Sequence, residues 1–521
     1  MFASLPRQGR ALMLVCAISL VTIWTYRLPR LCIFDQCPNS PKSVIPCASA
    51  LGYQRQSNSN SSSSDLDLSA PDAPFVAWPL ARVCGENKRW TPGLVFICDN
   101  NSGGIGNIRN FILTCLRYAI EAGATGLALP TIQSRSADKL DDLFVGDKLP
   151  FSYFFDEAHF RRGLAEACPQ ITIYRDDLAD LPGLGLDIEE PGGGRQRVAE
   201  APEQITPNHF GLRGGCDMRD LNRHSALFGE RFHAFLRDKD ESQSQEGGSN
   251  PQQEGQQRLA GLAGTIPKPR LVRMNWGVQW NWPVLQDGPE FAASYGGLLR
   301  FRADILSLGM KTADAMQALA LASSSPDNNN NKNDNRDGRR GSFVGIHLRT
   351  ESDALGAWPS FANQTAAYLA RVAGLDPPPP RHAYLATGNA TEAARLAAQA
   401  ESQQGLRVVT KHELLGQLPL LARQLDALSW DQQALVDFVV LLRCGFFLGV
   451  SPSSFSMNVA LKRHLGADAG AGADGQGGGS RGLLTRPWRV GDAQGDGRSW
   501  LVGRYDRYWD DWLFMYDSLW P

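Results

Sequence analysis

The alternation of short apolar segments with longer amphipathic segments is the feature that most constrains how this chain can fold. In its second half, short and mostly aliphatic runs are separated by stretches whose apolar residues recur at helical spacing. Strands that alternate with helices are typical of a parallel sheet built from crossover units. We predict strands at 343–348, 383–386, 406–409 and 446–450, and helices at 361–372, 391–403 and 430–442.

The first half carries one clear unit of the same kind. An apolar strand at 94–98 is followed by a loop at 99–106 and by a helix that Gly123 ends, and a second strand follows at 126–129. A strand, a helix and a strand in this order predict a parallel pair with a right-handed crossover. The chain has 521 residues, too many for one core, which stops growing at roughly 250–300 residues. We therefore predict an α/β protein with two doubly wound domains that face a cleft, with ligands at the carboxyl ends of the strands.

Composition places the domain boundaries. The uncharged run 11–26 lies between two pairs of arginines, and no small-residue cleavage site follows it, so we expect 1–30 to be a cytoplasmic tail and uncleaved signal anchor rather than a removed signal peptide. Residues 31–85 are assigned to a stem, and its segment 38–74, which is rich in Ser, Asn and Pro, is predicted to be disordered. The remaining predictions are a domain at 86–322, a polar linker at 323–340, a domain at 341–521 with an aromatic tail, and surface insertions at 238–257 and 466–482.

Glycosylation sequons and cysteines indicate on which side of the membrane the body lies. Sequons begin at Asn60, Asn100, Asn363 and Asn389, and nine cysteines follow the predicted anchor. Both features fit the lumen of the Golgi or endoplasmic reticulum, where disulfides form. Because nine is odd, at least one thiol stays free, and the pairing is not fixed by the sequence. The net charge of −2 gives no indication of a nucleic-acid partner.

Three loops at strand ends are candidates for a ligand site. The first, Gly103-Gly104-Ile105-Gly106-Asn107, precedes a helix; it reads either as a simple turn with Asn107 as a helix cap or as a loop that lets a pyrophosphate or sugar approach closely. The second begins with His347-Leu348-Arg349, where a buried histidine and an ion pair of Arg349 with Glu351 or Asp353 are the alternatives to a ligand contact.

The third loop is Ser451-Pro452-Ser453-Ser454-Phe455-Ser456, before the last predicted helix. Its serines can cap the helix and bind phosphate at once. A helix N-terminus offers free backbone N–H groups to a phosphate, and a nearby arginine adds a bidentate cationic fork. Together the three loops indicate a nucleotide-sugar site.

These three regions, with Asp437 before the third, resemble the signature regions of the GDP-fucose protein O-fucosyltransferase family in its broad sense. The residues from Gly103 and from Asp431 onward are similar to those of the fungal branch of that family. The resemblance runs from about 94 to 464. It implies a GT-B fold and transfer of fucose from GDP-fucose to a hydroxyl of a protein or a glycan, with inversion and with no metal or other cofactor. A catalytically silent binding protein with the same fold is the rival interpretation.

The resemblance also implies roles for individual residues. Arg349 would contact the β-phosphate and the glycosidic oxygen, His347 the pyrophosphate or ribose side, and Asp437 the guanine edge. Ser453, Ser454 and Phe455 would surround the phosphates, while Gly104, Ile105, Gly106 and Asn107 would approach the donor from the opposite domain, with Asn107 and Arg349 in catalytic roles.

Some family members place a glutamate in the first loop as the base that deprotonates the acceptor, and this chain has none there. Glu351, Asp353, Asp156 and Glu157 are possible substitutes, so the base stays open. The Asp-x-Asp triplets at 65–67 and 238–240 fall in polar tracts unsuited to a rigid metal site. The aromatic residues of 500–520 indicate packing between domains more than sugar binding.

Overall fold

The structure is a computed structural model that describes residues 67–521 apart from 136–139, 141–145, 185, 190–194, 199–200, 207–208, 211–223, 247–268, 276–279, 323–341, 355–357, 376–379, 452 and 467–496. The predicted anchor, most of the predicted stem, the 323–340 linker and nearly all of the 466–482 tract lie outside the described residues. Within those described, no helix is long and apolar enough to span a bilayer.

The first sheet has five strands in the order β5-β2-β1-β9-β8, and every neighbouring pair is parallel. The strands predicted at 94–98 and 126–129 are confirmed as β1 and β2, shifted by one to three residues at their ends. The helix between them is α3 (Ile105–Ala122). It ends at Gly123 with φ of 69°, where a Cβ atom would lie 1.5 Å from the carbonyl oxygen of Arg89, so only glycine fits. The strands are β1 (Thr91–Ile97), β2 (Ala124–Ala128), β5 (Thr172–Tyr174), β8 (Glu203–Ile205) and β9 (Arg270–Met274).

The second sheet also has five parallel strands, in the order β12-β11-β10-β13-β14. All four strands predicted there are confirmed. The fifth, β14, lies in the predicted aromatic tail and was not predicted as a strand. The bounds are β10 (Val344–His347), β11 (His382–Ala386), β12 (Arg407–Thr410), β13 (Phe446–Val450) and β14 (Ser499–Val502).

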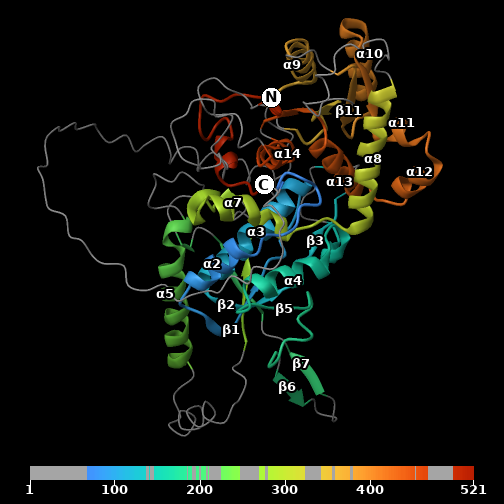
Figure 1. Cartoon of the computed structure of the whole chain (residues 1–521). Coiled ribbons are helices and arrows are strands. Elements are labelled where there is room, and N and C mark those ends of the chain that lie inside the picture. Colours follow the sequence, from blue (N-terminus) through green and yellow to red (C-terminus); the bar gives the residue numbers. More distant parts are fainter. Residues whose placement is uncertain are drawn as a thin grey trace, which may run out of the picture. The chain divides into compact units, whose positions relative to one another are not determined.

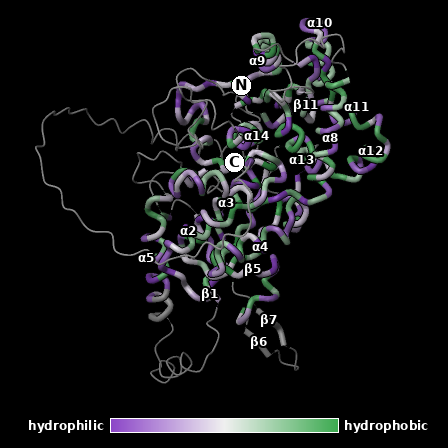
Figure 2. Tube along the Cα trace, in the orientation of Figure 1, coloured by the Kyte–Doolittle hydropathy of each residue, from purple (hydrophilic) through white to green (hydrophobic). Residues whose placement is uncertain are grey.

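The three helices predicted in the second half are confirmed as α9 (Phe361–Ala373), α10 (Ala390–Gln404) and α13 (Trp430–Leu442). Each begins at a residue whose side chain accepts a hydrogen bond from a backbone N–H of the first turn: Ser360, Asn389 and Ser429. At α13, Gln432 returns the hydrogen bond, which makes a capping box. The last five residues of α13, 438–442, and strand β13 are apolar throughout, as can be followed along the trace in Figure 2.

The other helices and short strands are shown in Figure 1. They are α2 (Trp78–Glu86), α4 (Glu157–Ala167), α5 (His224–Glu246), α7 (Pro289–Ser294), α8 (Ala303–Ala322), α11 (Lys411–Leu415), α12 (Pro419–Asp426), α14 (Ser454–His464), the 3₁₀ turns η1 (Phe151–Tyr153), η4 (Val284–Asp287), η5 (Tyr295–Leu298) and η8 (Leu513–Asp517), and the hairpin strands β3 (Ile132–Gln133), β4 (Lys148–Leu149), β6 (Leu186–Glu189) and β7 (Arg195–Val198).

Helix α2 corrects the predicted stem, which we extended to residue 85. Leu80 and Val83 are buried in the main core, and Cys84 forms a disulfide with Cys168. The last part of the 31–85 segment is therefore folded, because burying these apolar side chains outweighs the polar composition before them. A second correction concerns the insertion predicted at 238–257, whose first residues continue helix α5 to Glu246.

Helix α8 does not follow the predicted boundary at 323–340. We assigned it to the first domain, but it packs against α13, α11, α12 and β11, which belong to the second sheet and its helices. Figure 1 shows α8 in yellow beside the orange helices α11 and α13. Gly309 of α8 is the point of close approach, since a Cβ there would lie 2.6 Å from Cβ of Val439.

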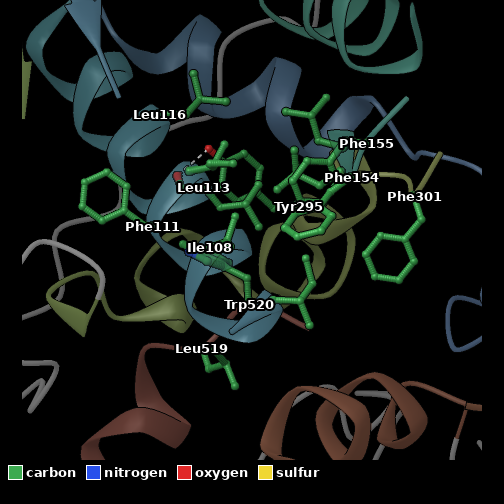
Figure 3. Packing of buried hydrophobic residues seen from close by; sticks show 14 of the residues in the cluster. Ile108, Phe111, Leu113, Leu116, Phe154, Phe155, Tyr295, Phe301, Leu519 and Trp520 are labelled. Atoms are coloured by element: carbon green, nitrogen blue, oxygen red, sulfur yellow. Dashed lines mark hydrogen bonds between the residues drawn. The ribbon is translucent and has the colours of Figure 1, made fainter. Parts of the chain in front are cut away.

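The end of the chain packs into the core that surrounds the first sheet. Trp520 is fully buried, and its ring meets those of Phe291 and Tyr295 edge to face. Figure 3 shows Trp520 close to Ile108 of α3 and to Tyr295, whose hydroxyl donates to the carbonyl of Leu113. The predicted packing role of the tail agrees with this part of the structure, where the 3₁₀ turn η8 leads to Trp520.

Candidate functional site

In both sheets the order of the strands reverses beside the first strand, so that later strands lie on both sides of it. Strand β1 is flanked by β2 and β9, and β10 is flanked by β11 and β13. Ligands of open parallel sheets bind beyond the carboxyl ends of the strands at such reversals. A cavity of about 480 Å³ lies at that place, lined by residues that follow β10, β11, β12 and β13 and by the loop before α3.

Nearly all the site residues predicted from the sequence meet in this cavity. They are Gly104, Ile105, Asn107, His347, Arg349, Asp437, Ser453, Ser454 and Phe455. Gly106 is the exception, because its α-carbon faces the start of α14. A Cβ at Gly106 would lie 2.8 Å from the carbonyl carbon and oxygen of Ser454, so this glycine serves close packing between two helix N-termini.

The loop before α3 brings backbone and one amide side chain to the cavity. Gly103 has φ of 91°, and Gly104 is the N-cap of the helix without a side-chain hydrogen bond. The interpretation of Asn107 as the helix cap is therefore wrong. Asn107 lies within the first turn, and its amide group is 3.0 Å from the position of a Cβ at Gly103. The helix begins with free N–H groups beside the cavity.

Arg349 follows β10 and is held by two carboxylates. One terminal nitrogen lies 2.6 Å from Glu351 and the other 2.6 Å from Asp353, while the guanidinium also stands over the ring of Trp358. Burial alone would lower the pKa of Arg349, but the two carboxylates raise it above its ordinary value. Gln364 accepts from the backbone N–H of Arg349 and donates to its carbonyl, which fixes the turn. The cavity thus contains a fixed cation.

His347 is a buried, neutral neighbour of that cation. Burial lowers its pKa to about 4, and its Nδ1 is 2.7 Å from the hydroxyl of Ser456. Its ring lies against that of Phe455, with centroids 4.5 Å apart. The interpretation as a satisfied core histidine therefore holds in part, but the side chain also lines the cavity.

The start of α14 places backbone and hydroxyl donors in the same cavity. Ser453 is the N-cap and accepts from the N–H of Ser456. The hydroxyl of Ser456 accepts from the N–H of Val450, so the loop between β13 and α14 is tied on both sides. An ordered helix N-terminus beside a fixed arginine can bind a phosphate group.

A buried polar cluster lies at the other end of the strand edge. The carboxylate of Asp437 accepts from the hydroxyl of Tyr384 at 2.6 Å and from Nζ of Lys411 at 2.7 Å. Burial and the neighbouring carboxylate raise the pKa of Tyr384 well above its usual value. Asp437 and Lys411 both line the cavity, so a carboxylate and an ammonium group can form hydrogen bonds with the polar edge of a ligand.

The four acids considered as catalytic bases fall into two groups. Glu351 and Asp353 line the cavity but form ion pairs with Arg349, and Asp353 forms a second ion pair with Arg135. Burial raises the pKa of Glu351, but Arg349, His347 and a backbone N–H from Gly388 together lower it, so it lies below the ordinary value. Asp156 caps α4 and Glu157 pairs with Arg161, and neither lines the cavity.

Sequence reasoning missed much of the cavity wall. Lys411, Thr387 and Gly388 follow β12 and β11, and the rule of strand carboxyl ends, applied to every predicted strand, would have found them. Other lining residues that were not predicted come from loops, strand ends and helix starts that no local signal marks as adjacent: Arg135, Leu140, Phe154, Trp280, Trp358, Ala386, Trp430, Asp431, Ala434, Trp512 and Met515. In the part of the chain that the structure describes, no group of three or more His, Cys, Asp or Glu side chains is arranged to hold a metal ion.

Comparison with known proteins identifies the family. The model of the family described as GDP-fucose protein O-fucosyltransferase matches residues 94–466. Among curated proteins there is no match. Solved structures with a similar chain course include POFUT1 in complex with GDP, at 12% identity over 73% of this chain and 97% of that chain, with a TM-score of 0.36.

Two further solved structures are a NodZ alpha-1,6-fucosyltransferase soaked with GDP-fucose and Arabidopsis thaliana FUT1 in complex with GDP. The first is 14% identical over 72% of this chain and 92% of that chain, with a TM-score of 0.29. The second is 12% identical over 74% and 72%, with a TM-score of 0.32. The family model covers well over half of the sequence, so the chain belongs to the GDP-fucose protein O-fucosyltransferase family and is a fucosyltransferase that depends on GDP-fucose.

Proposed function

We propose that this protein transfers fucose from GDP-fucose to a hydroxyl, in the first place that of a protein serine or threonine, with inversion at the sugar carbon and without a metal ion. The observation that carries the proposal is the meeting of Arg349, the N-terminus of α14 and the loop before α3 in one cavity at the strand reversals. We also propose that the two sheets are the two domains of a GT-B transferase, with the donor held mainly by the second.

The charges in the cavity suit the departure of GDP. As the bond between fucose and the β-phosphate breaks, negative charge grows on the phosphate and the sugar becomes cation-like. A guanidinium that two carboxylates already orient, together with the N–H groups at the start of α14, stabilises that charge without reorganisation. These donors do the work that a divalent cation does in other transferases.

The strand edge is long enough for the whole nucleotide. From β13 through β10 and β11 to β12 there are three strand steps, and neighbouring strands lie about 4.8 Å apart, so the edge spans roughly 14 Å. We place the phosphates at Arg349 and Ser453 and the base at Lys411 and Asp437. The ammonium and the carboxylate match the acceptor O6 of guanine and the donors beside it.

We further propose a lumenal body behind an N-terminal anchor, in the Golgi or the endoplasmic reticulum. Two disulfides, Cys84–Cys168 and Cys98–Cys115, support an oxidising compartment, while Cys444 is a buried free thiol. The amide of Asn100 donates to the carbonyl of Met274 near the cavity, whereas Asn363 is exposed on α9. Asn363 is therefore the better site for a glycan, and Asn389 is engaged as a helix cap.

A radiolabelled GDP-fucose assay of the full-length protein tests the function. We expect slow release of fucose to water without an acceptor, faster transfer when the correct acceptor is added, and unchanged rates in EDTA. Folded protein substrates and free glycans should be offered in parallel, because a glycan hydroxyl is the second candidate acceptor. Retention of GDP-fucose with neither hydrolysis nor transfer would instead favour a silent binding protein, and loss of activity in EDTA that manganese restores would contradict the metal-free chemistry.

A further inference from the structure

Four carboxylic acids line the cavity, and three of them are paired with cations. Glu351 and Asp353 hold Arg349, and Asp437 holds Lys411. A carboxylate that is ion-paired with a cation is a weaker proton acceptor, because the cation favours its charged form. The fourth acid is Asp431, which makes no ion pair with a described residue.

Asp431 is oriented through one oxygen only. Its Oδ1 accepts hydrogen bonds from the hydroxyl of Tyr153 at 2.7 Å, from the hydroxyl of Ser429 at 2.6 Å and from the backbone N–H of Gln432 at 3.0 Å. No hydrogen bond from the part of the chain that is described reaches Oδ2. The two hydroxyls also lie 2.5 Å from each other, so they share their protons with Oδ1 as one hydrogen-bonded group. One oxygen is thus held by this hydroxyl pair and a backbone N–H, while the other stays available on a side chain that lines the cavity.

The position of Asp431 is set by elements that flank Arg349 and by the first half of the chain. Its neighbour Trp430 lies against Gly388, where a Cβ would be 3.4 Å from the indole ring and 3.2 Å from Oε1 of Glu351. Glu351 in turn binds Arg349. From the other side, Gln432 donates to the carbonyl of Tyr153 at 2.9 Å, so the start of α13 is anchored to η1.

We propose that Asp431 is the general base of the transfer, an assignment that rests on the proposed function. Oδ2 of Asp431 takes the proton of the acceptor hydroxyl while the oxygen of that hydroxyl forms a bond to the anomeric carbon of fucose. The bond from that carbon to the β-phosphate oxygen breaks, and its electron pair leaves on GDP. Tyr153 and Ser429 are positioning residues, since they hold Oδ1 and so aim Oδ2.

The test compares Asp431→Asn with the wild-type protein and with Asp426→Asn, which makes the same change of charge on an exposed residue outside the cavity. We expect kcat of Asp431→Asn to fall about 10²- to 10⁴-fold, the usual contribution of a general base. Its KM for GDP-fucose should stay near wild type, and the acid limb of its pH–rate profile should disappear. Asp426→Asn should behave as wild type.

A second variant, Tyr153→Phe, guards against a folding defect in the first. It keeps the acid but removes one donor to Oδ1, so kcat should fall by less than in Asp431→Asn, and the acid limb of the pH–rate profile should remain. A wild-type kcat in Asp431→Asn, or a raised KM with unchanged kcat, overturns the assignment. Loss of the acid limb in an active Tyr153→Phe variant does so too. If the wild-type protein itself neither hydrolyses nor transfers, the proposed function fails instead.

Discussion

At the scale of single residues, the cavity is dominated by groups whose charge is fixed before any ligand binds. Both terminal nitrogens of Arg349 form ion pairs with carboxylates, and Lys411 forms an ion pair with Asp437. A buried charge without a partner costs several kcal/mol, so such groups are kept in pairs. The pairs also set direction, since the fork of Arg349 is aimed before the donor enters.

Replacing Arg349 should strongly impair transfer and also lower stability, because the largely buried Glu351 and Asp353 lose a cationic partner. We expect Arg349→Ala to lose about 10²- to 10³-fold in kcat, as is usual when one pre-aimed donor to a developing charge is removed. Arg349→Lys should be nearly as poor, because an ammonium cannot reproduce a bidentate fork. Transfer kinetics and circular dichroism measure the two effects, with the exposed Arg423→Ala as control. Near wild-type turnover in either Arg349 variant would falsify the phosphate assignment.

At the scale of elements, two helix N-termini from distant parts of the sequence meet at the site. Gly106 of α3 touches the backbone of Ser454 at the start of α14, and further along Arg109 donates to the side chain of Asn458. Arg109 is buried, and burial lowers its pKa to about 10. Because α3 leads from the first sheet and α14 from the second, their contact places the two loops on either side of one cavity.

Gly106→Ala tests how tight this contact is. The added methyl would stand 2.8 Å from backbone atoms of Ser454, so one helix start must move. We expect the free energy of unfolding to fall by about 1–3 kcal/mol and GDP binding to weaken. Gly85→Ala in α2 is the matched control, because a Cβ there meets no atom within 4 Å and alanine favours helix by up to about 1 kcal/mol. Urea unfolding and calorimetry with GDP measure both, and equal stability changes in the two variants would contradict the packing described.

At the scale of the whole molecule, the last segment joins both sheets. It contributes β14 to the second sheet and then carries Trp520 to α3 and η5, where the indole nitrogen donates to Thr114 and the backbone N–H to Asn110. Trp512 and Met515 line the cavity on the way. The tail is therefore part of the core and of the site at once.

Trp520→Ala should destabilise the protein by about 3–5 kcal/mol, since it empties a fully buried site of its largest side chain. The loss should appear as a lower melting temperature together with weaker GDP binding, because the tail also positions the cavity wall. Trp509 is 43% exposed, so Trp509→Ala is the control and should change stability little. Similar melting temperatures for the two variants would show that the tail is not part of the core.

The sequence by itself determined the elements whose causes are local. Strand β13 and helix α13 match their predicted bounds, because an apolar run and a capping box act over a few neighbouring residues. The order of strands and helices also determined that the sheets are parallel and that the loops with Asn107, Arg349 and Ser453 would lie at strand ends.

Tertiary structure alone decided which distant groups meet. Helix α8 packs with the helices of the second sheet, β14 pairs with β13, and Gly106 packs against the backbone of Ser454 outside the cavity lining. The sequence marks Asp431 only as part of a helix start. Only the contact with Tyr153 shows that one carboxylate oxygen of Asp431 is held and the other is available. The reason is physical: local propensity acts within a turn or a strand, whereas burial, charge pairing and close approach depend on residues that only the folded chain brings together.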